Sequence, residues 1–434
     1  SLIMEFSAGA KILIIFFGVL AASRLRVPLG AGLFGGGLAL DLWSGKSLQA
    51  LPADLWQALM RPELWLLAIT ITLIMEIGYF MASDENGKAI LALARRHGGK
   101  HGLAFSLVLI PAAIGMVPMP GGALFSAPLV GRTTKNSSNS PEWKAAVNYW
   151  FRHILEYWWP LYPVVIVTLS IFTLQTWKFM LLQIPFTFVS LGAGYFFLIR
   201  HHDFSFTDNT PEEQNLPGIF QIMLPIIIIV LAALLLPGLF HKLLPGLNPT
   251  SWKLLAMLTG LLISLGLIWH NRQDHSRKIF SDILSKKTMT VFITLAGVMI
   301  FESLLNSSGL IPLAGDELSL GNVPIGLIIA FLPFLAGLVT GIAIGFAGAA
   351  FPIVVGLISS GGDVSIQPLA ALVLAFSMGY AGMMLSPVHL CFLLTVDYFS
   401  ASFIKVYKYL LPCVLCIMVF GIFLYQILQI LLSH

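Results

Sequence analysis

The sequence predicts an all-α protein that crosses a membrane several times, and three observations support this fold class. Hydrophobic residues make up 57% of the 434-residue chain, whereas Asp, Glu, Lys and Arg together make up 10%, against about 25% in soluble domains. Apolar runs long enough to span a bilayer as helices recur along the whole chain. Two halves of the chain also repeat the same order of Gly- and Pro-rich features. An ordinary water-soluble globule is excluded.

The charge pattern is that of a membrane protein. The net charge is +4, but the basic residues lie in short clusters between apolar runs, which sets orientation in a membrane and does not form a nucleic-acid-binding surface. All three cysteines lie inside apolar runs, and no Cys or His pair has zinc-ligand spacing. We therefore expect no nucleic-acid partner, no disulfide, no metal site and no cofactor other than a coupling ion.

Apolar runs of about 17–25 residues can cross the hydrocarbon core as helices. The first run is followed by Arg24 and Arg26 and not by a small-residue cleavage site, so we expect it to remain as a spanning helix. The expected spans are 9–22, 27–43, 63–82, 144–173, 177–199, 219–240, 252–270, 289–306, 366–396 and 404–432.

Two further apolar stretches, 103–131 and 325–359, are too rich in Gly and Pro for one straight helix, and polar segments bound each of them. We predict that both are re-entrant hairpins, which survive at membrane depth only where protein or water satisfies their backbone groups. With the N-terminus outside, most of the 24 Lys and Arg residues fall on the inner side. This topology predicts a multi-pass protein of the inner (cytoplasmic) membrane.

The two hairpins belong to an internal repeat, with 1–200 as the first copy, 201–218 as a cytoplasmic linker and 219–434 as the second copy. Each copy has a glutamate after an apolar run, then a hairpin, then a long run broken by a proline, at 144–173 and at 366–396. Chance matches are the alternative, since Gly and Pro are common in membrane helices. The matching pairs are Glu76 and Glu302, Pro111 and Pro333, Gly115 and Gly337, Pro128 and Pro352, Gly131 and Gly356, and Pro160 and Pro387.

In the predicted topology the first hairpin enters from the inside and the second from the outside, so the copies are inverted. Inverted repeats with interrupted helices are typical of secondary transporters, whose substrate binds near the midplane between the repeats. Proline removes a backbone N–H and leaves free carbonyls at such an interruption. We expect the substrate to bind where the hairpin tips meet the broken helices.

This layout resembles the ion-transporter superfamily, and within it a gluconate-permease-related family of uncharacterised prokaryotic membrane proteins. The resemblance covers nearly the whole chain and rests on the repeated hairpins and broken helices. It implies a homodimer in which a transport part, 63–170 and 289–397, moves like an elevator against a scaffold. Sodium-dependent dicarboxylate members carry Ser-Asn-Thr at their hairpin tips, whereas the tips here read PMPGG and TGIAIGFAG.

These tips are the first candidate substrate contacts. Glycines let backbone N–H groups approach an anion, and proline fixes a turn; close packing of a tight hairpin is the alternative. The tip residues concerned are Pro118, Met119, Pro120, Gly121 and Gly122 in the first hairpin, and Thr340, Gly341, Gly345 and Gly348 in the second.

The first broken helix supplies a second group of candidates. Asn148, Arg152, Glu156 and Trp159 recur at helical spacing and share one face if the helix is continuous, and Tyr162 follows. An intramembrane arginine is functional by default, and Arg152 could clamp a carboxylate through two donors. The alternative is a structural pair between Arg152 and Glu156. His153 or Glu156 could instead carry a coupling proton.

Ser386 and His389 flank Pro387 in the second broken helix and could donate to the same anion, or His389 could satisfy a neighbouring group. Glu76 and Glu302 lie near helix ends, where capping or snorkelling explains them as well as proton carriage does.

The sequence thus predicts a secondary active transporter of a small organic anion, a carboxylate, coupled to H⁺ or Na⁺ and working by alternating access. The alternatives are a membrane-embedded enzyme acting on a lipid-linked substrate, and a channel. No Walker A or HExxH motif is present, so we expect neither ATP-driven transport by this chain nor enzymatic activity.

Overall fold

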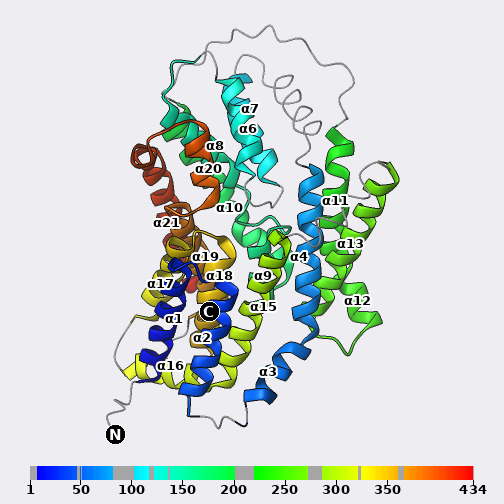
Figure 1. The fold of residues 1–434 in the computed structure, drawn as a ribbon, viewed down its shortest axis with the longest axis vertical. Helices are drawn as coiled ribbons and strands as arrows, with labels where there is room; N and C mark the ends of the chain where they lie inside the picture. Colours follow the sequence, from blue (N-terminus) through cyan, green and yellow to red (C-terminus); the bar gives the residue numbers. More distant parts are fainter. Residues whose placement is uncertain are drawn as a thin grey trace.

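The computed structural model describes residues 7–45, 49, 51–81, 102–116, 122–134, 137–200, 219–271, 286–320, 324–359 and 366–433. Over these ranges the chain is all-helical, with no β-strand (Figure 1). The helices are α1 (Ala8–Arg24), α2 (Leu29–Trp43), α3 (Leu51–Met60), α4 (Pro62–Met81), α6 (Gly102–Gly115), α7 (Ala123–Thr133), α8 (Pro141–His153), α9 (Pro163–Ile171), α10 (Thr176–Gly194) with a π-helical end (Tyr195–Ile199), α11 (Ile219–Leu235), α12 (Pro237–Leu243), α13 (Pro249–Asn271), α15 (Lys286–Ser307), α16 (Leu310–Leu320), α17 (Ile325–Thr340), α18 (Ala343–Ser359), α19 (Pro368–Met384), α20 (Leu390–Tyr398) and α21 (Phe403–Leu432).

The apolar helices are those of an integral membrane protein. Within the described residues, α10 with its π-helical end, α13 and α21 are each long and apolar enough to cross a membrane. Three bent pairs pass the same test together: α3 with α4, α11 with α12, and α15 with α16, bent by 49°, 50° and 68°. Large apolar side chains such as Phe188, Ile404 and Val419 are 65–80% exposed. Such faces are stable only against lipid or another apolar surface.

Both predicted hairpins are present as pairs of packed helices. Helices α6 and α7 contact each other in the first half of the chain, and α17 and α18 do so in the second. The second hairpin turns at Gly341, which has φ +65° and so occupies the left-handed region that glycine adopts without strain. The tip of the first hairpin between Met116 and Gly122 lies outside the described residues.

The first predicted broken helix is interrupted earlier than its proline suggested. Ser140 caps the start of α8 by accepting the Trp143 N–H at 3.2 Å, and α8 ends at His153. The non-helical segment 154–162 follows before α9 begins at Pro163. Pro160 and Pro163 lack the N–H groups that would continue the helical ladder, so a helix cannot propagate through this segment.

The second broken helix has a shorter interruption. Helix α19 ends at Met384, and α20 begins at Leu390 after five residues. Pro387 cannot donate to the carbonyl four residues before it. The Ser386 N–H bonds the Met383 carbonyl at 3.0 Å, which closes the last turn of α19 more tightly.

The two broken helices run in opposite directions, as an inverted repeat requires. In Figure 1, α8 lies toward the upper end with α9 below it, whereas α19 lies near mid-height with α20 above it, close to α8. The hairpins follow the same symmetry: the α6–α7 hairpin contacts α8 and α20, and the α17–α18 hairpin contacts α19 and α9. Each hairpin therefore contacts the first half of one broken helix and the second half of the other.

Close backbone packing fixes the hairpins in place. A Cβ atom on Gly115, at the end of α6, would overlap the carbonyl oxygen of Arg152 near the end of α8. In the other repeat, a Cβ on Gly382 of α19 would overlap the carbonyl of Phe334 of α17. The glycines allow two helix backbones to touch at each of these crossings.

Candidate functional site

The site is centred on the two interruptions, which are joined by a reciprocal pair of tyrosines. Tyr149 of α8 donates its hydroxyl to the carbonyl of Met384, the last residue of α19, at 3.1 Å. Tyr380 of α19 donates to the carbonyl of His153, the last residue of α8, at 2.6 Å. Each tyrosine lies four residues before the end of its own helix. Each broken helix thus receives a hydrogen bond at its last carbonyl from the opposite repeat.

The interruptions also satisfy the ends of the hairpin helices. Trp159 donates its indole N–H to the Met116 carbonyl at 2.9 Å, and the Tyr162 hydroxyl donates to the Gly115 carbonyl. In the second repeat, Ser386 donates to the Leu338 carbonyl at 2.7 Å. The sequence predicted Trp159, Tyr162 and Ser386 as substrate contacts. In the structure the Trp159 N–H, which is the only donor of that side chain, is already engaged in holding the hairpin.

Arg152 and Glu156 lie in the protein interior, 2% and 7% exposed. The predicted shared helical face of residues 148, 152, 156 and 159 is wrong, because α8 ends at His153 and both Glu156 and Trp159 belong to the interruption. The Arg152 guanidinium still interacts with Glu156, and both groups interact with the Tyr162 hydroxyl. A buried cation, a carboxylate and a phenol therefore meet at one point beside the end of α8.

Asn148 connects the two repeats one turn earlier. Its side-chain amide donates to the Thr395 hydroxyl of α20 at 3.1 Å, and neither residue is exposed. Its carbonyl oxygen has no hydrogen-bond partner among the described residues. Asn148 therefore keeps one acceptor that a protonated ligand group could use.

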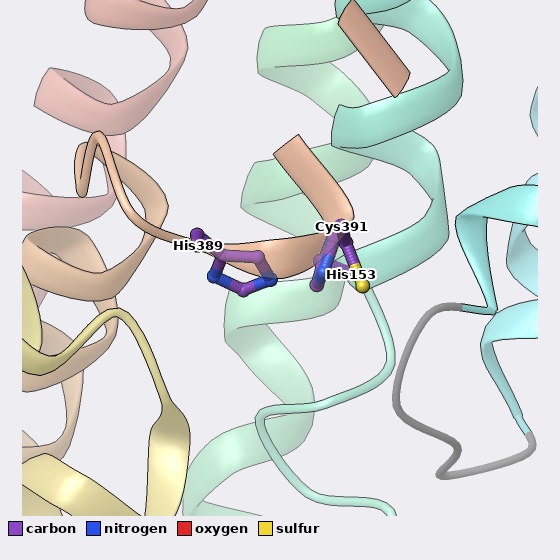
Figure 2. A group of neighbouring side chains, drawn as sticks. All are labelled: His153, His389 and Cys391. Carbon is purple, nitrogen blue, oxygen red and sulfur yellow. The ribbon is translucent and has the colours of Figure 1, made fainter. Parts of the chain in front are cut away.

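His153, His389 and Cys391 form a compact group beside these residues (Figure 2). His153 closes α8, His389 is the N-cap of α20, and Cys391 lies in the first turn of α20. The ring centroids of the two histidines are 5.1 Å apart. One donor atom from each of the three residues falls within 4.8 Å of the others. The sequence singled out His153 and His389 separately but did not connect them with Cys391, because His153 lies in the first repeat and the other two residues lie in the second.

The tip of the second hairpin touches the second interruption. A Cβ atom on Gly341 would lie 2.9 Å from both the backbone nitrogen of His389 and the hydroxyl oxygen of Ser386. Thr340 bonds back to the Ala336 carbonyl at 2.6 Å. The predicted tip was too long, since α18 begins at Ala343 and contains Gly345 and Gly348.

Gly348 has a packing role that its place in the hairpin explains. It lies in the second turn of α18, where a Cβ atom would overlap Val298 of α15. Gly345 faces the Thr340 side chain across the turn. Of the first tip, Gly122 lies at the start of α7, and the remaining residues, Pro118, Met119, Pro120 and Gly121, fall outside the described residues.

The two repeat glutamates lie five residues before the ends of their helices, α4 and α15. Glu76 is 4% exposed within α4. Glu302, within α15, lies 3.7 Å from a terminal guanidinium nitrogen of Arg61, and Arg61 also lies 3.5 Å from Glu63. Glu302 therefore belongs to an ion-pair group at the α3–α4 bend, toward the lower end of Figure 1, and no contact with the interruption residues is found among the described residues.

Glu63 connects this ion-pair group to the start of α13. Its carboxylate accepts from the Asn248 side chain and, at 2.9 Å, from the Ser251 hydroxyl at the start of α13. The sequence analysis did not single out Arg61 or Glu63. A signal was available in Arg61-Pro-Glu63 at the start of an apolar run, since charged side chains next to a membrane-spanning segment are costly unless they pair with one another.

Comparison with known proteins agrees with this architecture. The family model described as "Protein of unknown function (DUF401)" matches residues 51–428. The chain belongs to this family. Among solved structures it is similar to the Alcanivorax borkumensis YdaH transporter, whose crystal structure is described as having an unusual topology. The two are 15% identical, the match covers 98% of each chain, and the TM-score is 0.57. No curated protein matches the chain.

The likeness to the YdaH transporter concerns the fold. It supports the predicted all-α architecture. These comparisons concern DUF401 and the YdaH transporter and do not bear on the relation to gluconate permeases that the sequence suggested.

Proposed function

We propose that this protein is a secondary active transporter that carries a small organic anion by alternating access. One observation carries the proposal: the interruptions of two antiparallel broken helices meet and bond each other through Tyr149 and Tyr380. A site built equally from two inverted repeats can be opened toward either side by exchanging the conformations of the repeats. An enzyme has no need of such two-sided symmetry.

The chemistry at the interruptions favours a carboxylate as substrate. Arg152 supplies a buried guanidinium whose paired donors match a carboxylate. The groups that interact with it include Cys391, Tyr162 and Glu156, of which Glu156 is the acidic one. We propose a small or partly apolar monocarboxylate in preference to a tricarboxylate, because one cationic side chain next to Glu156 balances little additional negative charge.

Coupling to an ion gradient is assigned to the acidic and imidazole groups beside Arg152. The His153 Nε2 atom lies 3.9 Å from a Glu156 carboxylate oxygen, so a proton held between them would alter the charge that faces a bound anion. We propose H⁺ as the coupling ion on this basis, with Na⁺ as the alternative. Glu302, paired with Arg61, is a weaker candidate for coupling.

The motion is proposed to be of the elevator type, in a homodimer located in the inner membrane. The hairpins contact the broken helices through bare backbone at Gly115 and Gly382, which supports movement of hairpins and broken helices as one body. The YdaH transporter is by its name a transporter, and the gluconate-permease resemblance of the sequence points the same way.

Reconstitution into liposomes tests the proposal. We expect counterflow of a radiolabelled monocarboxylate that accelerates with an inward pH or Na⁺ gradient, and we expect Lys178→Gln, at an exposed position of α10, to match the wild type. Ohmic single-channel current would establish a channel instead. Chemical conversion of a lipid-linked compound with no counterflow of any carboxylate tested would establish an enzyme.

The role of Arg152 can be separated from a structural one. We expect Arg152→Gln to abolish counterflow. We expect the double variant Arg152→Gln with Glu156→Gln, which removes both charges of the pair, to remain inactive although it folds. Transport by the double variant would show that Arg152 only neutralises Glu156, and the clamp would be refuted.

A further inference from the structure

We propose that His153, His389 and Cys391 form a binding site for a transition-metal ion, and that Zn²⁺ fits their donor atoms best. Two imidazoles and one thiolate are a zinc donor set, and a fourth ligand completes a tetrahedron. The site does not depend on the chain being a transporter. It follows from the positions of the three side chains at the crossing of the broken helices (Figure 2).

The protonation of His153 is fixed by its surroundings. Its Nδ1 atom lies 2.6 Å from the Tyr149 carbonyl oxygen, which can only accept, so Nδ1 carries the hydrogen. In the neutral ring Nε2 then bears the lone pair. His153 is buried, and its side chain interacts with the side chain of Cys391. Metal-binding histidines are oriented in this way, by donation of the other ring N–H to a carbonyl.

His389 repeats this arrangement from the opposite repeat. Its ring makes a backbone hydrogen bond with Met383, while its Nδ1 atom is buried without a hydrogen-bond partner in the described part of the chain. Figure 2 shows the ring edge facing His153 and Cys391. A shared metal ion would use the lone pair that each neutral imidazole offers toward Cys391.

The spacing of the donor atoms is slightly wider than a closed zinc site. Zinc bonds of about 2.0–2.3 Å in a tetrahedron place ligand atoms about 3.3–3.7 Å apart, whereas the three donor atoms here lie within 4.8 Å of one another. Small side-chain rotations of the two histidines and Cys391 close this difference. No movement of α8 or α20 is required, because each residue already faces the others.

The fourth position is left to a water molecule or a substrate group. One carboxylate oxygen of Glu156 lies 3.9 Å from His153 Nε2, but Glu156 does not belong to the group whose donor atoms all lie within 4.8 Å of one another. A Cys391 thiolate offsets one of the two charges of a divalent ion. Binding releases the thiol proton to the medium.

Cobalt(II) substitution tests the site on the purified full-length protein in detergent. We expect metal-free protein to bind about one Co²⁺ per chain, with visible bands typical of tetrahedral Co²⁺ and a near-ultraviolet band from thiolate-to-cobalt charge transfer; Zn²⁺ should displace both. Cys391→Ser should lose the charge-transfer band, and His389→Ala should weaken binding at least tenfold. Cys416→Ser, at a half-buried position in α21, is the matched control and should bind as the wild type does.

The result that overturns the proposal is equally specific. A wild-type protein that gives no cobalt spectrum at millimolar Co²⁺, or a spectrum that Cys391→Ser leaves unchanged, removes the site. A measurement without substitutions guards against misfolded variants: Zn²⁺, but not Mg²⁺, should raise the unfolding temperature of the wild type. These readouts do not involve transport, so a failure here leaves the carrier proposal to be judged by its own counterflow experiment.

Discussion

The reciprocal tyrosines at the two interruptions give a quantitative test of how the broken helices are held together. Tyr149→Phe removes one hydroxyl and keeps the ring, whose centroid lies 5.1 Å from Phe392 and 5.4 Å from His389. The Met384 carbonyl then loses the only donor found for it among the described residues. A buried acceptor left without a partner costs about 1–3 kcal/mol.

The symmetry-related change is expected to cost less. Tyr380→Phe also removes a buried hydroxyl, but the His153 carbonyl keeps a second donor, the Glu156 N–H at 3.1 Å. The loss is then the net value of one hydrogen bond, about 0.5–1.5 kcal/mol. We expect Tyr195→Phe, whose side chain is 60% exposed on the π-helical end of α10, to have no measurable effect.

Titration of detergent-solubilised protein with sodium dodecyl sulfate, followed by far-ultraviolet circular dichroism, gives the free energy of unfolding of each variant. The expected order of destabilisation is Tyr149→Phe, then Tyr380→Phe, then Tyr195→Phe. The reasoning is refuted if Tyr149→Phe is indistinguishable from the exposed control, or if Tyr380→Phe is the more damaging of the two buried changes.

Two further predictions concern packing and pH. Gly115→Ala places a methyl group against the Arg152 carbonyl. Because a backbone atom cannot rotate away as a side chain can, we expect a sharp fall in the yield of folded protein, measured by size-exclusion chromatography. Gly192→Ala, at a position with open space around it, should express normally, and equal yields of the two variants would contradict the close contact. At the polar start of α8, hydrogen bonds from its own N–H and from the Ser402 N–H hold the pKa of Glu142 below its ordinary value of 4.5. A carboxyl group whose pKa is lower in the folded state than in the unfolded state stabilises the protein at pH values above the unfolded-state pKa, and this stabilisation is lost as the pH falls through the folded-state pKa. Glu142→Gln should therefore lower the unfolding temperature at pH 7 more than at pH 4. A difference in unfolding temperature that does not depend on pH would exclude this linkage.

Much of the architecture could be predicted because it depends on local sequence signals. Apolar runs, Lys and Arg clusters and the prolines at 160 and 387 report on hydration and on backbone hydrogen bonding, and both act within a few residues. The hairpins and broken helices were therefore predicted near their observed positions. The end of α8 at His153 could not be, because the carbonyl there is satisfied by Tyr380 from the other repeat.

The site was predicted less completely for the same reason. Arg152, His153, Glu156 and His389 were singled out because polar groups in apolar runs are costly, which is visible in sequence. Tyr149 and Cys391 looked like ordinary members of their helices. Their importance arises only from neighbours in the opposite half of the chain.

The amino-acid sequence alone determined that this protein resides in a membrane as helices and that its two halves repeat one another, because the free energy of burying apolar surface and of satisfying backbone groups depends on composition and spacing. Only the tertiary structure decided which polar groups meet. Antiparallel crossing of the broken helices brings His153 against His389 and Cys391, and such contacts depend on the packing of helices far apart in the chain, which no local pattern records.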